Sequence, residues 1–448
     1  MKKAKDKKEN KYGKYFGRKW GPAIIAVLRL IVGAVFLFSG FTKGIDPWGS
    51  VYKFDEYLNS FGFYDYDGLL LFMAFSVSAV EFVLGMFMLL GIYRRFTPVA
   101  MLLMMAVMLP LTLYIAITND VADCGCFGDA VTISNWGTFW KNVALTLALT
   151  YLLLFNKHVK NIYGFAVQWI VAFISFAYIL SVAWIGYSYQ PLLDFRPFPV
   201  GTVISPDAAY HEGNSENFMF VYEKNGISQE FTIDSLPDET WTFVDRIPIP
   251  QVSKAATDPA IYRPITVMDI DHEIADGAII DDGEQLLLLF PSLSDVVIPF
   301  TYLINETCDF CHSHGIDVVG LTSNGKAEID EWNDLSMADY PMYVMDDSEL
   351  KMLARGNPAA VFLRNGKIEW KRTMQSIPVD NIDNVDSLDQ LVGDTTPRHV
   401  LYTMSAIYLA AMLLVLIINR THIVVKFSLR RVRKNRKKQV NLQQESEE

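Results

Sequence analysis

Six long apolar runs divide the chain, and each has the roughly 17–25 residues that a helix needs to cross a bilayer. They cover Pro22–Phe41, Leu69–Gly91, Pro98–Ile117, Trp136–Phe155, Ala166–Tyr187 and Val400–Ile418. No small-residue cleavage site follows the first run, so we expect a span and not a signal peptide. A buried core helix explains one such run but not six, and the pattern predicts a membrane all-α bundle of six transmembrane helices.

Between the fifth and sixth runs the pattern becomes that of an α/β domain. Short strand-like runs fill residues 195–263, and residues 264–392 mix strands with helices. The continuous apolar runs Gln285–Phe290 and Ile316–Leu321 are typical of strands buried on both faces. A helix is expected between them, over Asp295–Ser313. We therefore expect an α/β domain with a β-rich N-terminal extension.

An Asn-Gly turn at residues 365–366 predicts a β-hairpin, because this dipeptide favours the turns that join antiparallel strands. Its strands are expected over Ala359–Arg364 and Lys367–Lys371. The other expected strands are Phe218–Tyr222, Gln229–Ile233, Trp241–Val244, Pro264–Ile270 and Met342–Met345, and the other helices are Ser336–Asp339, Ser348–Arg355 and Ser376–Val392.

The stretch Ile45–Phe63, between the first two runs, mixes aromatic side chains such as Trp48 and Tyr57 with acidic ones such as Asp55. A short segment of this composition suits the boundary between lipid and water. We interpret it as an interfacial amphipathic segment, with ordinary loop packing as the alternative.

Charge is segregated along the 448 residues, of which 51% are apolar and 20% charged. Residues 1–19 carry nine Lys/Arg against two acids, and residues 419–448 carry nine against three. Residues 188–397 carry 36 Asp/Glu against 12 Lys/Arg. Because basic loops stay in the cytoplasm, we expect an inner-membrane protein with both tails cytoplasmic and residues 188–397 periplasmic. The acidic block would repel phosphates, so we expect no nucleic-acid partner.

Two charges lie inside predicted spans, where an unpaired charge is costly. Counted from the cytoplasmic ends at roughly 1.5 Å per residue, Arg29 lies ~10 Å deep and Glu81 ~15 Å deep, a difference that an Arg side chain covers. We expect an intramembrane pair between them. Either the pair only fixes helix register, or Glu81 titrates during proton-coupled redox chemistry. Lys43, at the outer end of the first span, is expected to reach the interface.

Cys124 and Cys126 flank Gly125 in the loop between the third and fourth runs. A Cys-x-Cys disulfide closes a small ring that is strained and easily reduced, and glycine supplies the backbone freedom such a ring needs. We interpret the pair as redox-active. The alternatives are two packed free thiols, or a cation site formed with Asp123 and Asp129.

Cys308 and Cys311 lie near the C-terminal end of the helix expected over Asp295–Ser313. The helix dipole opposes thiolates there, so a local disulfide is the main interpretation and a redox partner role the alternative. His312 completes the Cys-x-x-Cys-His pattern of c-type haem attachment. We do not favour a haem, because the α/β context offers no helical pocket and His314 is too near to ligate opposite His312. A metal site is favoured still less.

Three separated motifs lie in the first four runs: the segment from Arg29 to Lys43, Glu81 followed by Gly85, and the Cys-Gly-Cys-Phe-Gly-Asp loop. Together they resemble the DoxX/MauE family over residues 20–156. The resemblance implies a four-helix membrane bundle. It also implies disulfide formation or thiol maturation of exported proteins, and thiol-to-quinone electron transfer.

The segment Gly356–Ile368 and the element order of residues 264–392 resemble a thioredoxin-like domain of the TlpA or peroxiredoxin-related type. In that family a cis-proline precedes the hairpin and faces the active site, which places it at Pro358. The family's Cys-x-x-Cys would directly follow the first buried strand, where this chain has Ser292 and Ser294. The resemblance therefore implies a degenerate active site.

These features favour thiol–disulfide redox chemistry in the cell envelope. The Cys124–Cys126 loop would exchange disulfides with exported proteins, with a membrane quinone as a candidate electron partner. The alternative is a non-catalytic binding or scaffold protein, whose thioredoxin-like domain is anchored by the spans. The client and the direction of electron flow stay open.

Overall fold

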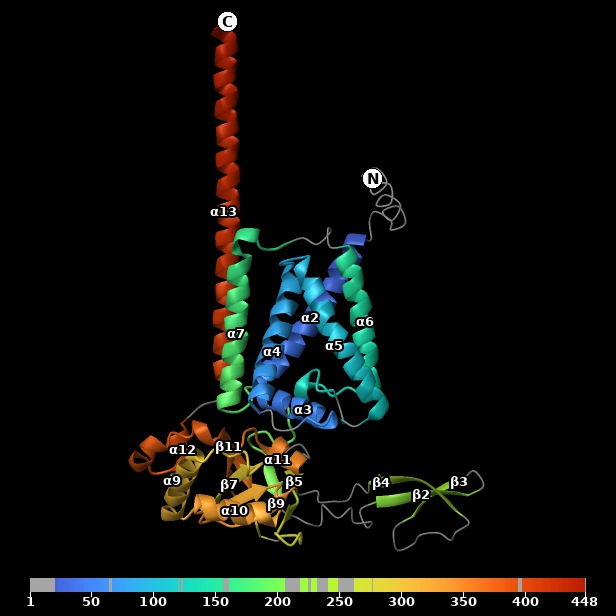
Figure 1. The fold of residues 1–448 in the computed structure, drawn as a ribbon, viewed down its shortest axis with the longest axis vertical. Coiled ribbons are helices and arrows are strands. Elements are labelled where there is room, and N and C mark those ends of the chain that lie inside the picture. The colour runs from blue at the N-terminus through green and yellow to red at the C-terminus, as the bar shows by residue number, and fades with distance from the viewer. Residues whose placement is uncertain are drawn as a thin grey trace. The chain divides into compact units, whose positions relative to one another are not determined.

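The computed structural model describes residues 21–63, 67–119, 121, 124–155, 161–205, 218–224, 227–231, 241–248, 262–275, 277–393 and 397–447. The chain divides into two compact units (Figure 1). The membrane unit comprises Met1–Tyr187, Pro191–Leu193 and Thr396–Glu448, and the sheet unit comprises Ser188–Gln190 and Asp194–Thr395.

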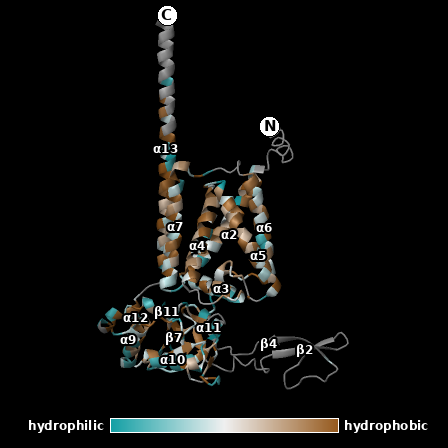
Figure 2. Ribbon diagram, viewed as in Figure 1, coloured by the Kyte–Doolittle hydropathy of each residue, from teal (hydrophilic) through white to brown (hydrophobic). Residues whose placement is uncertain are grey.

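The membrane unit is helical. Its long helices are α2 (Gly21–Ile45), α4 (Asp67–Leu90), α5 (Phe96–Thr118), α6 (Asn135–Leu154), α7 (Gln168–Ser188) and α13 (Pro397–Glu447). Within the described residues, five segments are long and apolar enough to cross a membrane: Pro22–Ile45, Gly68–Leu90, Phe96–Thr118, Phe165–Ser188 and Arg398–Val425. Figure 2 shows the hydrophobic residues along these helices in brown. Five of the six expected spans are therefore confirmed as membrane-length apolar helices.

The run expected over Trp136–Phe155 is a helix, α6, but it is not one of these five. Its first half contains Lys141 and Asn142, which interrupt the apolar run. Both residues line a cavity inside the bundle. The expectation of six transmembrane helices is therefore confirmed for five of them and not for α6, which contributes polar side chains to the interior.

The backbones of α2 and α4 touch at two glycines. A Cβ atom added to Gly40 would lie 2.3 Å from the backbone nitrogen of Phe82, and one added to Gly85 would lie 2.4 Å from that of Leu37. Only a residue without a Cβ allows so close an approach. This contact fixes the register of the two helices, and with it the partner of each charge that they carry.

Tyrosines join α7 to α13. The rings of Tyr178 and Tyr408 stack with their centroids 4.4 Å apart. The hydroxyl of Tyr178 lies 2.8 Å from Ser405 Oγ, and that of Tyr408 lies 3.0 Å from Ser175 Oγ. Hydrogen bonds between helices satisfy polar side chains where water is excluded. The two helices accordingly run side by side, although more than two hundred residues separate them in the chain (Figure 1).

The segment expected to be amphipathic over Ile45–Phe63 folds as helix α3 (Pro47–Ser60). Asp46 caps its N-terminus by accepting a hydrogen bond of 2.9 Å from the backbone N–H of Gly49. Phe54 and Tyr57 are buried, whereas Glu56 on another face is exposed. The alternation of aromatic and charged residues thus corresponds to one packed face and one open face.

The sheet unit contains an eight-stranded mixed sheet. Its strands follow the order β5 (Tyr262–Pro264), β1 (Val203–Ser205), β11 (Lys367–Thr373), β10 (Ala359–Arg364), β7 (Glu284–Phe290), β8 (Asp317–Thr322), β9 (Met342–Met345) and β6 (Val267–Met268). Strands β7, β8 and β9 are parallel, and β10 pairs antiparallel with both β7 and β11. The two buried strands and the Asn-Gly hairpin are therefore confirmed.

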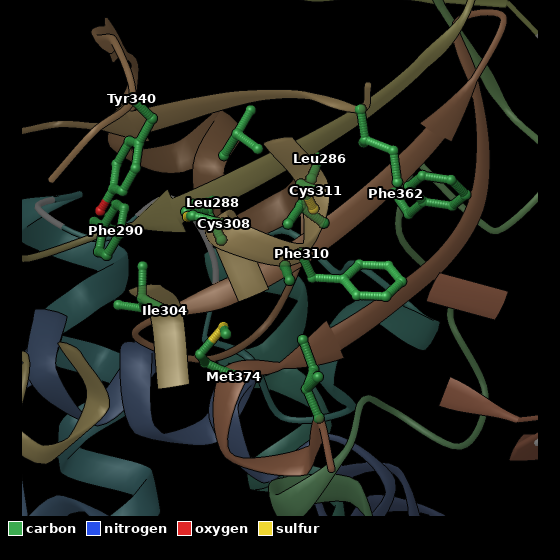
Figure 3. Close-up of a cluster of buried hydrophobic side chains, with 14 of the residues drawn as sticks. Leu286, Leu288, Phe290, Ile304, Cys308, Phe310, Cys311, Tyr340, Phe362 and Met374 are labelled. Atoms are coloured by element: carbon green, nitrogen blue, oxygen red, sulfur yellow. The ribbon is translucent and has the colours of Figure 1, made fainter. Parts of the chain in front are cut away.

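Successive side chains of β7 enter two different cores, which explains its continuous apolar run. Leu286, Leu288 and Phe290 belong to the core drawn in Figure 3, and Leu287 and Leu289 belong to the core on the opposite face. The first core is completed by α9 (Pro299–Ser313), α10 (Lys326–Ser336) and α12 (Leu388–Val392), and the second by α11 (Asp347–Leu353).

Two helix expectations for the sheet unit are wrong. The helix expected at Ser336–Asp339 lies earlier, as α10, where Ile329 and Trp332 form the buried stripe. The single helix expected over Ser376–Val392 is replaced by η6 (Met374–Ser376), η7 (Val379–Asn384) and α12. Pro378 separates the first two pieces, since proline lacks the N–H that a continuous helix requires.

The β-rich extension expected over residues 195–263 contributes to two sheets. Strands β2 (Phe218–Lys224), β3 (Ile227–Phe231) and β4 (Thr242–Pro248) form a separate antiparallel sheet. Strands β1 and β5 pair with each other and add to the edge of the large sheet next to β11. The large sheet therefore begins well before residue 264.

Candidate functional site

The Cys-Gly-Cys sequence lies in the loop between α5 and α6, and its two sulfur atoms are close. Cys124 Sγ and Cys126 Sγ are 3.1 Å apart, and both residues are free thiols. Gly125 between them has a φ of +58°, and an added Cβ would lie 2.9 Å from Lys53 Cγ. Glycine is thus required twice, for its backbone conformation and for the contact above it. The site brings two thiols together, as a dithiol–disulfide couple requires.

A buried ion pair lies directly beneath this loop. Lys43 Nζ is 2.7 Å from Glu81 Oε2, and both side chains are almost fully buried. The same ammonium group donates to Ser39 Oγ at 2.9 Å and to the backbone carbonyl of Cys126 at 3.2 Å. A buried charge requires a partner and further hydrogen bonds, and here one of those bonds reaches the cysteine loop.

The expected pair between Arg29 and Glu81 is wrong. Arg29 donates instead to the backbone carbonyls of Met88 and Leu89 at the C-terminal end of α4, each at 3.1 Å. The contact of Gly40 with Phe82 places Glu81 near the far end of α2, so Lys43 is its neighbour. The expectation that Lys43 extends to the interface is wrong for the same reason.

Helix α3 covers the loop. The Tyr57 hydroxyl donates a hydrogen bond to the carbonyl of Cys124, and the Lys53 stem lies over Gly125. Cys124 is buried, whereas Cys126 is only partly buried. A reaction partner therefore has better access to Cys126 than to Cys124.

The surroundings also shift the pKa values of the two thiols in opposite directions. The pKa of Cys126 is lowered to about 6, chiefly because the Cys124 thiol donates a hydrogen bond to its sulfur. Burial opposes this shift, and the positive charges of Lys141 and Lys43 assist it. The pKa of Cys124 is raised well above its usual range by the same contact and by burial. Since the thiolate is the nucleophile, Cys126 is the reactive member and Cys124 keeps its proton.

A cavity of about 60 Å³ extends from the two thiols into the helix bundle. Its polar wall contains Ser39, Lys43, Glu81, Lys141 and Asn142, together with the two cysteines. Its apolar wall includes Val35, Phe36, Val77, Met104, Met105, Met108 and Leu111. The pair is therefore in contact with an amphipathic space that reaches inward between the helices.

Five residues of the site were missed in the sequence: Ser39, Lys53, Tyr57, Lys141 and Asn142. Lys141 carried a usable signal, because a lysine inside an apolar run needs a polar surrounding. Its ammonium group lies 4.3 Å from the centroid of Phe127, the residue after Cys126. Ser39 and Lys43 lie one helical turn apart, a spacing that places both on one face. Tyr57 and Lys53 had no signal in the sequence that linked them to the cysteines, since the fold alone brings α3 over the loop.

Cys308 and Cys311 have a different environment. Both are buried near the end of α9, where Figure 3 shows them among the apolar side chains of the core. Burial and the nearby charges of Asp309 and Asp339 raise the pKa of Cys308 to about 12, and burial raises that of Cys311 further. These thiols are packing residues in this state, and neither is poised for attack.

The positions after strand β7, where the sequence resemblance places the missing redox cysteines, contain hydroxyls. Ser292 Oγ and Ser294 Oγ lie 3.1 Å apart, and Asn357 Nδ2 donates to the Ser292 carbonyl at 2.6 Å. The Asn357–Pro358 peptide bond is cis, so the expected proline geometry is present beside a site without sulfur.

The haem and metal alternatives gain no support from the geometry. His312 follows a cysteine that points into the core, and the ring of His314 stacks on Phe310 with centroids 4.0 Å apart. Among the described residues, no three His, Cys, Asp or Glu side chains lie close enough to hold a metal ion. Asp123 lies outside the described residues, and Asp129 is exposed.

Comparison with known proteins gives two family matches. Residues 21–155 match the family described as methylamine utilisation protein MauE, and residues 217–250 match a domain of unknown function (DUF8463). No curated protein matches the chain. The MauE match and the apolar helices together indicate a MauE-like, multi-pass membrane protein.

Among solved structures, the similar ones include two peroxiredoxins. The reduced 2-Cys peroxiredoxin of Plasmodium vivax is 12% identical, with 27% of this chain and 77% of that chain covered and a TM-score of 0.19. The mitochondrial 2-Cys peroxiredoxin of Plasmodium falciparum is 13% identical, with 32% and 88% covered and a TM-score of 0.19.

Proposed function

We propose that this MauE-like membrane protein carries out thiol–disulfide exchange through Cys124 and Cys126. The observation that carries the proposal is the 3.1 Å separation of the two sulfurs above a cavity that contains Lys43, Glu81 and Lys141. One thiol of low pKa beside one of high pKa is the arrangement of an attacking and a resolving cysteine. A purely structural pair of thiols needs neither the cations nor the cavity.

The exchange proceeds in two displacements. The Cys126 thiolate attacks a client disulfide, which gives a mixed disulfide and releases one client thiolate. Cys124 then loses its proton, and its thiolate attacks the Cys126 sulfur, which closes the Cys124–Cys126 disulfide and releases the second client thiolate to take up a proton. Two electrons pass from the pair to the client, and the reverse sequence oxidises a client dithiol. We propose exported proteins as the clients.

The apolar wall of the cavity supports a membrane quinone as the electron partner of the pair. Met104, Met105 and Met108 present flexible, polarisable surfaces there. A quinone would take two electrons and two protons from the dithiol and leave the disulfide. The charge distribution along the chain supports an inner-membrane location, with both termini cytoplasmic and residues 188–397 periplasmic.

Differential thiol labelling in glutathione buffers of graded potential tests the exchange function. In the full-length protein we expect Cys124 and Cys126 to pass together from thiols to a disulfide over a narrow range of potential. The Cys308→Ala/Cys311→Ala variant should keep the same midpoint, because these residues are buried packing groups in the core of the sheet unit. A pair that stays fully reduced or fully oxidised across the whole range contradicts the proposal.

A second candidate is a non-catalytic binding or scaffold role, which the sheet unit favours. We infer a thioredoxin-like, TlpA-type fold for it from the strand order, the cis Pro358 and the helices on both faces of the sheet. Ser292 and Ser294 occupy the positions expected for the redox cysteines, and Cys308 and Cys311 are buried. If Cys124→Ser/Cys126→Ser leaves the redox state of exported proteins unchanged, this second role is favoured.

A further inference from the structure

The ammonium group of Lys43 is completely satisfied. It has three protons to donate, and three acceptors lie around it: Glu81 Oε2 at 2.7 Å, Ser39 Oγ at 2.9 Å and the Cys126 carbonyl at 3.2 Å. Lys43 therefore has no capacity to change its protonation without leaving an acceptor unfilled.

Ser39 is in the opposite situation. Its Oγ lies 2.7 Å from Glu81 Oε2 and 2.5 Å from the Cys126 carbonyl, but a hydroxyl has one proton to donate. With Glu81 ionised, one of these two close oxygen–oxygen contacts has no proton in it. A proton on Glu81 completes the network, since Glu81 then donates to Ser39 and Ser39 donates to the carbonyl of Cys126.

The vacant proton position opens onto the cavity that holds both thiols. The charged or titratable residues that line this cavity are Lys43 of α2, Glu81 of α4, Lys53 and Tyr57 of α3, Lys141 of α6 and the two cysteines. Lysine and tyrosine already hold their protons near neutral pH. Glu81 is thus the lining side chain, among the described residues, that is able to accept one from a thiol.

We propose that Glu81 is the proton acceptor when the Cys124–Cys126 disulfide closes, an inference that rests on the proposed exchange function. After Cys126 has formed the mixed disulfide, the Cys124 thiol gives its proton to Glu81 through the cavity, which has room for water. The Cys124 thiolate then attacks the Cys126 sulfur, and the client thiolate leaves. Glu81 afterwards returns its proton to the released thiolate or to solvent. In the opposite direction Glu81 protonates Cys124 as the ring opens.

Single-turnover reaction of the reduced, full-length protein with oxidised glutathione separates the two steps. Acid quenching and mass measurement follow first the mixed disulfide and then the closed ring. General-base catalysis contributes roughly 10²–10⁴-fold, so Glu81→Gln should slow closure by about 100-fold or more and accumulate the mixed disulfide. Formation of the mixed disulfide should change little, because it depends on the Cys126 thiolate. Glu81→Asp should restore much of the closure rate.

Two further variants test whether the effect on ring closure is specific to the Glu81 network. Ser39→Ala keeps the ion pair but removes the acceptor of the Glu81 proton, so it should also slow closure selectively, by about 10-fold, the equivalent of one lost hydrogen bond of about 1.4 kcal/mol. Ser78→Ala should close at the wild-type rate, because Ser78 lies on the same helix as Glu81 and, among the described residues, its hydroxyl donates to the Phe75 carbonyl of that helix.

Closure of Glu81→Gln at the wild-type rate overturns the inference, and so does equal slowing of both steps, which is the signature of a structural role. If Glu81→Gln does not fold, unchanged closure in Ser39→Ala overturns it instead. Absence of both the mixed disulfide and the closed ring in the wild-type protein has a different meaning, because it removes the proposed exchange function and the inference with it.

Discussion

Lys43 and Glu81, on neighbouring helices, form a 2.7 Å ion pair with 10% and 8% of their side-chain surfaces exposed. Such a pair adds little net stability, because the cost of removing two charges from water is large. The hydrogen bond from Lys43 to the Cys126 carbonyl in the cysteine loop indicates another use. Under the proposed function, the positive charge of Lys43 lies near the Cys126 thiolate, and the carboxylate of Glu81 lies where it accepts the Cys124 proton.

The pH dependence of alkylation should distinguish the two thiols of the loop. Because the pKa of Cys126 is about 6, its reaction with iodoacetamide should be half-maximal near that pH and level off above it, as the thiolate fraction saturates. Cys124 should react far more slowly throughout. Peptide mass spectrometry after timed quenching measures both rates, and equal rates at neutral pH would contradict the assignment.

Lys141→Gln should raise the pKa of Cys126. The substitution removes a positive charge that favours the thiolate and keeps a polar side chain that is one atom shorter. The half-maximum of the alkylation profile should therefore move to higher pH, with a lower rate at pH 7. Lys53→Gln is the matched control, since the lysines that lower the pKa of Cys126 are Lys141 and Lys43, whereas Lys53 covers the loop with its stem and pairs its charge with Glu56 at 3.0 Å. It should leave the profile close to that of the wild type.

Gly85→Ala should destabilise the membrane unit strongly. The new methyl group would lie 2.4 Å from the backbone nitrogen of Leu37, and overpacking against a backbone costs about 3 kcal/mol or more. Gly68→Ala, on the same helix, is the control because, in the part of the chain that the structure describes, its added Cβ meets nothing within 4 Å beyond its own neighbours in the helix. Thermal unfolding of the purified protein in detergent should show a large loss for the first variant and none for the second.

Asp194→Asn should loosen the sheet unit. Asp194 bonds to Arg196 at 2.7 Å and to Lys371 at 2.7 Å, and both cations are buried. Removing one partner of a buried ion pair costs about 3–5 kcal/mol. Hydrogen exchange of β11 in the full-length protein should therefore rise by about 100-fold or more. Adding Lys371→Met should recover part of the protection, and protection that is unchanged in the single variant would refute the effect.

The same carboxylate makes the sheet unit sensitive to acid. Burial alone would raise the pKa of Asp194, but Arg196 and Lys371 outweigh it and hold the pKa well below its usual range. A lowered folded-state pKa contributes stability that is fully present above the unfolded value of about 3.9 and is lost as the pH falls below it. Exchange of β11 in the wild type should increase over that acidic interval, and Asp194→Asn should lack the increase.

The helices and strands of both units could be predicted where the sequence has a long apolar run or a specific turn signal. Apolar runs gave the membrane helices, and the Asn-Gly turn gave the hairpin of β10 and β11. The helix over Ser376–Val392 could not be predicted correctly, because it depends on caps and a proline that divide a polar, weakly periodic segment.

The partner of Glu81 could not be predicted from hydropathy, because the ends of an apolar run do not fix how deep a residue lies relative to the neighbouring helix. Arg29 precedes Gly40 by eleven residues, which is roughly 16 Å along a helix, and Gly40 is the residue that meets Phe82 beside Glu81. An Arg side chain does not cover that distance. The positions of the small residues set the register, and a hydropathy count does not include them.

The glycine contacts between α2 and α4 leave these two helices no freedom to slide. Their main chains already touch at Gly40 and Gly85, so the scaffold that carries Lys43 and Glu81 behaves as one stiff block. When the sulfurs of Cys124 and Cys126 move from 3.1 Å apart to bonding distance, the backbone of the loop that carries them has to change its conformation. Formation of the Cys124–Cys126 disulfide therefore changes the conformation of the loop between α5 and α6, while helices α2 and α4 keep their positions.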